Sequence, residues 1–311
     1  MRSVRAILNR HQPVAVKKTR GMFSLWTGTP MFSVNRGPLV VQTLAVCLAR
    51  QAFNETHFIT DARGAKLAEL LGWEFTHVST ALEELDAQEM EHIWALGKIA
   101  ALIEATKDGE PICQIDNDVL LFEPLPDRLL SEALVAQSPD HERFYWGGDM
   151  EKAFAISGLP RNSVKYNAGI IGGADVPLVR AYAYASLDQA QKFRGNRLNG
   201  TTTSMMVEQV SLGVFGKRCL VEVGTLFSMP PTKVRYPHYA HLVGPAKRDP
   251  VEVAQCMTML RARFPEAAAK FEEGWKKAMA LFPGCGGKCG CAESPQGKAG
   301  CGCHGSNLYG Q

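Results

Sequence analysis

The sequence predicts an α/β fold in which helices cover both faces of a mostly parallel mixed sheet. The first observation is an alternation of short apolar runs with helix-like segments between residues 22 and 116. Successive strand–helix units of this kind form parallel sheets with crossover helices. The second is size, because 311 residues of 46% hydrophobic composition can bury a substantial core. One large α/β domain or two small ones would satisfy both observations.

Hydrophobic periodicity and glycine punctuation place the individual elements. Strands are expected at residues 22–28, 56–61, 73–79, 111–116, 167–173 and 219–224. Helices are expected at residues 38–53, 62–72, 92–109, 175–193, 201–216, 250–263 and 265–281, with a mixed region before residue 166. From residue 284 onward glycine and cysteine replace large apolar residues. The chain therefore divides into a basic arm (1–21), a globular domain (22–283) and a Gly/Cys-rich tail (284–311).

Charge and hydropathy argue against a nucleic-acid-binding, membrane-spanning or secreted protein. The net charge is only +3, and no basic stripe with interleaved aromatic residues indicates nucleic-acid binding. No apolar run reaches the roughly 18 to 20 residues of a membrane span, and the N-terminus lacks the apolar core of a secretory signal. We therefore expect a soluble cytoplasmic protein without a transmembrane segment. The first acidic residue is Glu55, so the basic N-terminal segment either faces an anion or is a solvated arm.

Two aspartates, Asp116 and Asp118, follow the apolar run in "PICQIDNDVLLFEP". They sit at the carboxyl end of an expected strand, the edge at which open α/β sheets bind ligands. Side chains alternate along an extended chain, so both carboxylates project to one side while Asn117 points away. Paired carboxylates suit a hard divalent cation such as Mg²⁺ or Mn²⁺. Asp-x-Asp is also an ordinary turn or cap pattern.

Two later motifs make the pattern specific. "YNAGIIGG" (166–173) and "HLVGPAKRD" (241–249) follow "QIDNDVLLFEPL" in the order and at about the spacing found in nucleotide-sugar glycosyltransferases of the GT-A fold. The closest likeness is to the retaining family that includes glycogenin and bacterial lipooligosaccharide galactosyltransferases. The resemblance covers roughly residues 22–249. It implies a three-layer, Rossmann-like GT-A domain in which the Asp-x-Asp (DXD) motif carries Mn²⁺ or Mg²⁺.

The resemblance also assigns roles to single residues. It makes His241 a third metal ligand, places Gly244 and Lys247 on the donor diphosphate, and puts Asn167 under the donor sugar. These residue types suit those roles: an imidazole completes a metal shell, glycine admits a phosphate closely, and lysine supplies a positive charge. The alternative is a plain turn with His241 in the core and Lys247 in solvent, and an ordinary glycine-rich strand around Asn167.

Four further positions are candidates for donor contacts. The family places an Asp-Gln pair near the donor sugar and the reacting carbon, where this chain has Glu208 and Gln209. Glu208 would contact the sugar if the reaction retains configuration, or act as a general base if it inverts; an exposed helix-surface pair is the alternative. Asp61 is a candidate to bond a uracil or ribose, and Lys98 to reach a phosphate. A helix cap and a surface charge are the plainer readings of these two.

These motifs predict a metal-dependent hexosyltransferase that moves a sugar from a nucleoside diphosphate donor, UDP-linked for preference, to a glycan, protein or small-molecule acceptor. Catalysis would be chiefly electrostatic, through charge stabilisation on the departing diphosphate. A nucleotidyltransferase or sugar-nucleotide hydrolase could use the same metal–diphosphate clamp. A non-catalytic binding protein that acts through its tail is the other alternative.

The tail contains a second cluster of candidate ligands. Its members are Cys285, Cys289, Cys291, Cys301, Cys303 and His304. Without an export signal, a disulfide framework is not expected. Soft thiolates favour Zn²⁺ or Cu⁺, so we expect a soft-metal site separate from the aspartates. A disordered reduced tail, or one that recognises a partner or is itself modified, are the alternatives.

Overall fold

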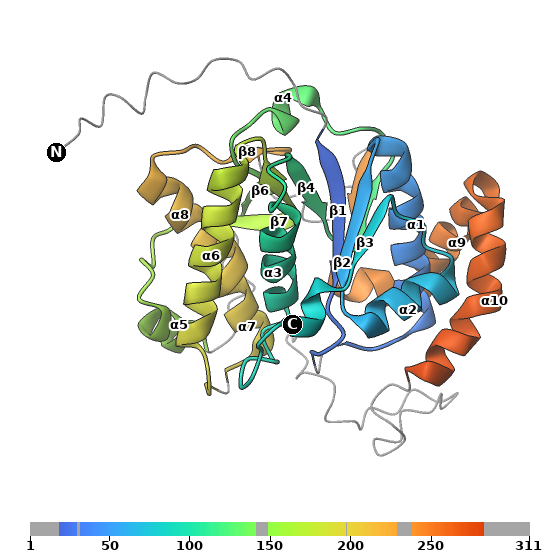
Figure 1. Cartoon of the computed structure of the whole chain (residues 1–311), viewed down its shortest axis with the longest axis horizontal. Helices are drawn as coiled ribbons and strands as arrows, with labels where there is room; N and C mark the ends of the chain where they lie inside the picture. Colours follow the sequence, from blue (N-terminus) through green and yellow to red (C-terminus); the bar gives the residue numbers. More distant parts are fainter. Residues whose placement is uncertain (1–18, 30–31, 141–148, 197, 229–237, 283–311) are drawn as a thin grey trace.

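The computed structural model describes residues 19–29, 32–140, 149–196, 198–228 and 238–282. Within them, seven strands form one sheet in the order β3-β2-β1-β4-β7-β6-β8. Figure 1 shows α3 and α6 on one side of this sheet and α1, α9 and α10 on the other. The predicted three-layer α/β fold with a mostly parallel mixed sheet is therefore confirmed. The Cys-rich tail and nearly all of the basic arm lie outside the described residues.

The sheet consists of β1 (Arg20–Leu25), β2 (Thr56–Thr60), β3 (His77–Ser79), β4 (Ile112–Ile115), β6 (Val135–Asp140), β7 (Lys165–Gly173) and β8 (Gly224–Thr225). A separate ribbon pairs β5 (Val119–Leu121) with β9 (Tyr239–His241). The α-helices are α1 (Arg36–Ala52), α2 (Ala62–Leu71), α3 (Ala95–Ala105), α4 (Asp127–Leu130), α5 (Met150–Ser157), α6 (Val176–Lys192), α7 (Gly200–Met205), α8 (Ser211–Cys219), α9 (Pro250–Arg263) and α10 (Pro265–Leu281). Shorter helical segments are the 3₁₀ turns η2 (Ala81–Glu84) and η5 (Gly244–Arg248) and the π turn η4 (Met206–Val210).

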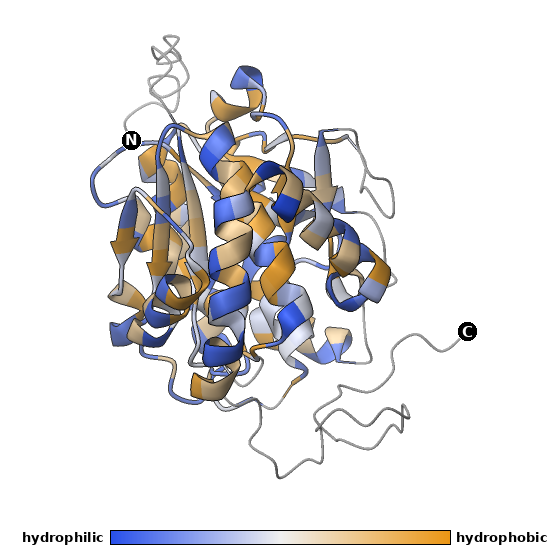
Figure 2. Cartoon of the chain, turned by 90° about the vertical axis from the view of Figure 1, so that its right-hand side faces the viewer, coloured by the Kyte–Doolittle hydropathy of each residue, from blue (hydrophilic) through white to orange (hydrophobic). Residues whose placement is uncertain are grey.

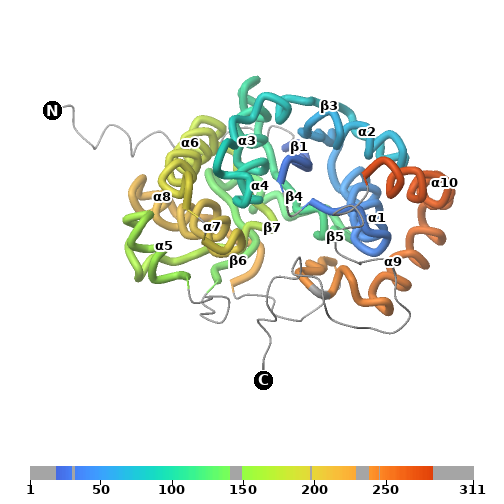
Figure 3. Tube along the Cα trace, turned by 90° about the horizontal axis from the view of Figure 1, so that it is seen from below, coloured from blue at the N-terminus to red at the C-terminus, as the bar shows by residue number. Residues whose placement is uncertain are grey.

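Strand direction divides the sheet into two parts. β3, β2, β1 and β4 are mutually parallel, as the strand–helix alternation predicts. β7 runs antiparallel to both of its neighbours, β4 and β6, and β8 is parallel to β6. β5 continues the chain beyond β4 and leaves the sheet to pack beside α1, as Figure 3 shows. The carboxyl end of β4 thus lies where the parallel part, the antiparallel strand and the ribbon meet.

Two hydrophobic cores cover the two faces of the sheet. Phe23 and Phe58 pack toward α1, α2, α9 and α10, whereas their neighbours Met22 and Ile59 pack toward α3 and α6. This division follows from the alternation of side chains along a strand. The outer helices show hydrophilic and hydrophobic residues on different faces in Figure 2, which is the pattern of amphipathic helices. None of the described helices combines the length and hydropathy that crossing a bilayer requires.

Some predicted boundaries were wrong. The strand expected at residues 219–224 is mostly absent, because α8 continues to Cys219 and ends at Leu220, which takes a left-handed φ of 55° and is 81% exposed. The apolar residues of this run do not form a continuous strand: Leu220 is exposed, while Val221 is partly buried and Val223 is buried against the core. The strand expected at 73–79 is reduced to β3, and the mixed region contains the unpredicted β6 and α5.

Candidate metal and nucleotide-sugar site

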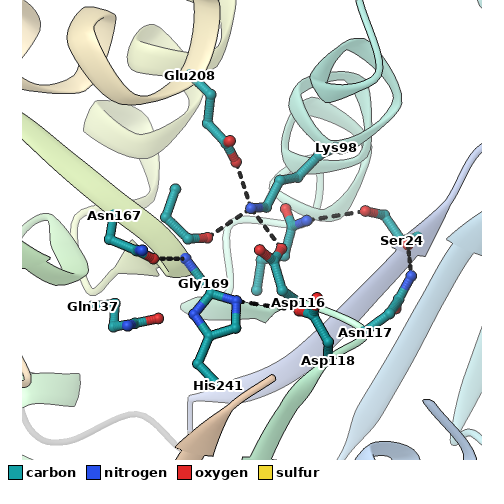
Figure 4. Close-up of polar contacts among 12 residues, drawn as sticks. Ser24, Lys98, Asp116, Asn117, Asp118, Gln137, Asn167, Gly169, Glu208 and His241 are labelled. Atoms are coloured by element: carbon teal, nitrogen blue, oxygen red, sulfur yellow. Dashed lines mark hydrogen bonds and ion pairs between the residues drawn. The ribbon is translucent and has the colours of Figure 1, made fainter. Parts of the chain in front are cut away.

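The two aspartates flank a tight turn between β4 and β5. Asp116 donates its N–H to the carbonyl of Gly169 at 2.9 Å, and its own carbonyl accepts from Val119 at 3.0 Å. The segment is thus a turn and not the extended strand assumed from the sequence. The Asn117 side chain nevertheless points away, because its Nδ2 donates to the carbonyl of Ser24 at 3.0 Å. The two carboxylates lie on one side, as predicted (Figure 4).

Strand pairing brings His241 to this turn from more than a hundred residues away. Val119 lies opposite His241 in the β5–β9 ribbon, and Leu242 donates to the carbonyl of Asp118 at 2.9 Å. The imidazole Nε2 lies 3.2 Å from Oδ1 of Asp118. One ligand atom from each of Asp116, Asp118 and His241 falls within 4.8 Å of the others.

Lys247 approaches the same carboxylate from η5. Its Nζ lies 2.8 Å from Oδ2 of Asp118. Burial of Asp118 by itself favours the protonated acid, but His241 and Lys247 outweigh it and hold the pKa of Asp118 well below its ordinary value. Asp118 is therefore ionised at neutral pH. Its two oxygens face the imidazole of His241 and the ammonium of Lys247. A cation bound to Asp118 would take the place of one or both of these contacts.

These donors fit the metal that the sequence predicts. Two carboxylates and one imidazole form a mainly oxygen donor set, which suits Mn²⁺ or Mg²⁺ and leaves coordination positions for phosphate oxygens and water. Among the residues that the structure describes, this is the one cluster of three or more such side chains.

On the other side of the turn, Lys98 connects Asp116 to Glu208. Its Nζ donates to the carbonyl of Ala168 at 2.6 Å, lies 2.6 Å from Oδ1 of Asp116 and forms an ion pair with Oε1 of Glu208. Burial disfavours the ammonium, but the two carboxylates raise the pKa of Lys98 above its ordinary value. An ammonium has three N–H donors, and here three acceptors surround it. Contact between Lys98 and a donor phosphate stays a prediction, and it would replace one of these partners.

Glu208 enters the site through a π turn. The segment η4 widens the helix that α7 and α8 otherwise continue, and such one-turn π segments occur frequently at functional sites. The Glu208 side chain is buried, and burial together with the charge of Asp116 raises its pKa to about 7 although Lys98 acts in the opposite direction. Glu208 is thus a carboxyl that changes protonation near neutral pH. Gln209 is half-buried on the same turn.

The remaining predicted residues have different local surroundings. Asn167 is on β7, and its Oδ1 accepts from the N–H of Gly169 at 2.9 Å. Gly244 opens η5 with a φ of +53°, a conformation that favours glycine. Asp61 caps α2 through Gly64 at 2.8 Å and accepts from the N–H of Thr27 at 2.6 Å, so it fastens the end of β2 to the chain after β1. Its contact with a nucleotide stays a prediction.

Sequence reasoning missed two polar residues beside His241. Gln137 is buried on β6, and its Oε1 accepts from the hydroxyl of Tyr239 at 2.7 Å. No motif marks either residue, and β6 itself was not expected. The one available signal was Gly169 in "YNAGIIGG", because a Cβ at that position would lie 2.1 Å from Oε1 of Gln137 and 2.7 Å from Cε1 of His241.

Comparison with known families places the chain in a group without an assigned activity. The sequence model of a family of unknown function, DUF6734, matches residues 38–273, which is well over half of the chain. The chain belongs to DUF6734. No curated protein matches this DUF6734 chain.

Three solved structures to which this chain is similar are named as glycosyltransferases or as variants of one. The galactosyltransferase LgtC in complex with donor and acceptor sugar analogues has 17% identity and a TM-score of 0.43, and the match covers 84% of this chain and all of LgtC. An active-site mutant of LgtC has 15% identity and a TM-score of 0.43, over 78% of this chain and 96% of that one. The PaToxG glycosyltransferase has 10% identity and a TM-score of 0.37, over 85% and 87%.

Proposed function

We propose that this DUF6734 protein is a metal-dependent glycosyltransferase that moves a sugar from a nucleoside diphosphate donor, UDP-linked for preference, to an acceptor. The observation that carries the proposal is the convergence of Asp116, Asp118 and His241 within 4.8 Å, with Lys247 on Asp118. Two sequence motifs more than a hundred residues apart thus meet at one point, and the third motif borders it, because the Gly169 carbonyl accepts from the N–H of Asp116. Such a cluster is what a clamp for a cation and a diphosphate requires.

The residues of the site would have different roles according to their charge. Asp116, Asp118 and His241 would hold the cation, which when bound neutralises charge on the diphosphate leaving group. Lys247 is one-third exposed, so its ammonium can turn from Asp118 to a phosphate oxygen. Gly244 leaves its side of η5 open, since a Cβ there would meet no atom within 4 Å. Asn167 and Gln209 would bind hydroxyl groups of the donor sugar.

Glu208 has two possible roles that depend on its protonation. As a carboxylate it would accept hydrogen bonds from the donor sugar, and its pKa of about 7 also suits a general base toward the acceptor nucleophile. The stereochemistry of the product separates these roles, because a general base on the acceptor implies inversion and a sugar contact is compatible with retention.

The deciding experiment is a screen of the purified protein against nucleotide sugars, with added Mn²⁺, with added Mg²⁺ and with excess chelator. We expect nucleoside diphosphate release with at least one donor, dependent on the metal and lost in Asp118→Asn. A control variant, Asp188→Asn, changes an exposed aspartate on α6 and should behave as wild type. Product analysis with simple glycans, peptides and small alcohols as acceptors then identifies the transferred group.

Each alternative activity gives a different product. Free sugar in the absence of any acceptor indicates a sugar-nucleotide hydrolase, and release of pyrophosphate from a nucleoside triphosphate and a sugar phosphate indicates a nucleotidyltransferase. Full activity in excess chelator, or in Asp118→Asn, contradicts the proposed role of the aspartates. No turnover and no nucleotide-sugar binding with any donor contradicts the glycosyltransferase assignment itself.

A further inference from the structure

The two ring nitrogens of His241 differ in their polar contacts. Nε2 faces Asp118, while Nδ1 is buried and has no hydrogen-bond partner among the residues that the structure describes. A histidine that binds a metal through one nitrogen almost always donates its other N–H to an acceptor, which fixes the tautomer and the ring orientation. If His241 is a ligand, as the proposed function requires, an acceptor for Nδ1 should lie beside it.

Gln137 supplies an acceptor in the right place. Figure 4 shows its amide directed toward the imidazole, on the side away from Asp118. A Cβ on Gly169 would lie 2.1 Å from Oε1 of Gln137 and 2.8 Å from Nδ1 of His241, so both atoms border the same small space. Because residue 169 is a glycine, no side chain separates them.

Two features hold the Gln137 amide in this orientation. The register of β6 against β7 shifts between Ala136 and Ser138, an irregularity of the kind that redirects a side chain beside an active site. Oε1 accepts a hydrogen bond from the Tyr239 hydroxyl at 2.7 Å. An amide oxygen accepts two hydrogen bonds, so one position remains for His241.

We propose that Gln137 is a positioning residue for His241. Its amide oxygen, held by Tyr239, accepts a hydrogen bond from the Nδ1–H of the imidazole. The proton then stays on Nδ1, and the lone pair of Nε2 faces the metal. Gly169 is required because it leaves the space through which the two side chains meet. This inference rests on the proposed function, since it assumes that the cluster of Asp116, Asp118 and His241 binds a divalent ion.

The test measures metal binding without turnover, by the EPR signal of free Mn²⁺ in titrations of the full chain. Gln137→Met keeps the volume of the side chain but removes the acceptor, and we expect Mn²⁺ affinity to fall about 10- to 100-fold. Gln137→Glu restores an acceptor and should retain affinity near that of wild type. Gln189→Met, which replaces a buried glutamine on α6, is the matched control and should leave affinity unchanged.

Gly169→Ala provides a second, independent variant. The added methyl group would occupy the space between Gln137 and His241, so we expect a loss of Mn²⁺ affinity similar to that of Gln137→Met. Gly274→Ala is its control, because there a Cβ would lie 1.7 Å from the carbonyl of Leu70, between α10 and α2. This variant should lose stability without losing affinity for the metal.

A spectroscopic signature separates positioning from a general loss of folding. In the Co²⁺-loaded protein, the d–d bands should shift in Gln137→Met and return in Gln137→Glu, while the far-UV spectrum stays constant. Should Gln137→Met not fold, Tyr239→Phe takes its place, with a smaller loss of affinity expected. Wild-type binding of Mn²⁺ together with unchanged affinity in folded Gln137→Met and Gly169→Ala overturns this inference alone. Absence of Mn²⁺ binding in the wild type overturns the metal site, and the proposed function with it.

Discussion

Asp118 and Asp116 stand one residue apart, but their charges are balanced in different ways. Asp118 faces both an ammonium, on Lys247, and the imidazole of His241. On the other side of the turn, Asp116 and Glu208 share the single buried ammonium of Lys98. The first side has two nitrogen partners for one carboxylate, and the second has one cation for two carboxyl groups.

The difference appears in the protonation of the acids. The pKa of Asp118 lies well below its ordinary value, whereas that of Glu208 rises to about 7. Burial raises the pKa in both cases, so the neighbouring groups determine the sign of the net shift: His241 and Lys247 lower the pKa of Asp118, whereas at Glu208 the charge of Asp116 acts against that of Lys98. Asp118 therefore stays ionised, as the proposed site for a cation and a diphosphate requires. The side of Glu208 contains a carboxyl group that can gain or lose a proton near neutral pH.

Removal of the shared cation should have the largest effect. Lys98→Met leaves the buried carboxyl group of Glu208 and the partly buried one of Asp116 without their ammonium. Removing one partner of a buried ion pair costs about 3–5 kcal/mol. We expect a loss of that order in the free energy of unfolding, measured with denaturant near neutral pH in chelator. Lys152→Met, at an exposed position on α5, is the control and should change little.

A double variant tests the cause of this loss. Lys98→Met combined with Glu208→Gln removes both the cation and one of the two acids that it compensates, so most of the lost stability should return. A double variant as unstable as Lys98→Met would contradict the idea that Lys98 compensates both acids, and would indicate that its contact with the Ala168 carbonyl is the decisive one.

The second effect concerns catalysis on the side of Asp118. Asp118→Ala removes a carboxylate that the proposed clamp needs, and turnover of a nucleotide sugar should fall on the order of 100-fold or more, several kcal/mol of transition-state stabilisation. Steady-state rates across a range of Mn²⁺ concentrations measure this. Asp188→Ala should retain the wild-type rate. Undiminished turnover in Asp118→Ala would place the chemistry elsewhere in the molecule.

Local sequence patterns predicted the secondary structure better than they predicted the contacts that build the candidate site. The parallel strands, the α2 cap at Asp61 and the helices α9 and α10 follow from periodicity and capping residues close together in the chain. The convergence of His241 on the aspartates depends on the β5–β9 ribbon, which no local pattern predicts. That convergence was expected only because the order of the motifs resembled a family.

The sequence did not predict that Lys98 forms ion pairs with both Asp116 and Glu208. Lys98 was expected to reach a phosphate or to lie on the surface, and Glu208 was expected on a plain helix. The π turn that directs Glu208 inward, and the burial that moves its pKa, depend on packing between α3, β7 and η4. Gln137 shows the same limit, because its orientation results from an irregularity in β6 that leaves no mark in the residue pattern.

A smaller effect follows from the titration of Glu208. Its pKa of about 7 in the folded protein exceeds the ordinary value of 4.5, so between these values the folded state binds more protons than the unfolded state. The free energy of unfolding should therefore fall as pH rises through this window. The side chain in Glu208→Gln does not titrate in this window. The free energy of unfolding of this variant, relative to wild type, should therefore increase between about pH 5 and about pH 8, by on the order of 1–3 kcal/mol.

Denaturant titrations in chelator at several pH values measure this difference. Glu273→Gln removes an exposed carboxyl group on α10 and is the control for loss of a charge. A constant stability difference between Glu208→Gln and wild type across the window would show that Glu208 does not take up a proton there. Its pairing with Lys98 would then dominate, and the proposed contrast with Asp118 would disappear.

The smallest effect should come from Lys247, the exposed partner of Asp118. Because its side chain is one-third exposed, Lys247→Ala should change the free energy of unfolding by less than about 1 kcal/mol. If its ammonium moves to the donor diphosphate, KM for the nucleotide sugar should rise about 10-fold, which corresponds to about 1.4 kcal/mol of binding, while Lys247→Arg should retain part of that binding. Initial rates at saturating Mn²⁺ separate the effect on KM from that on kcat. An unchanged KM in Lys247→Ala would mean that Lys247 serves only to balance the charge of Asp118, and that another group binds the phosphate.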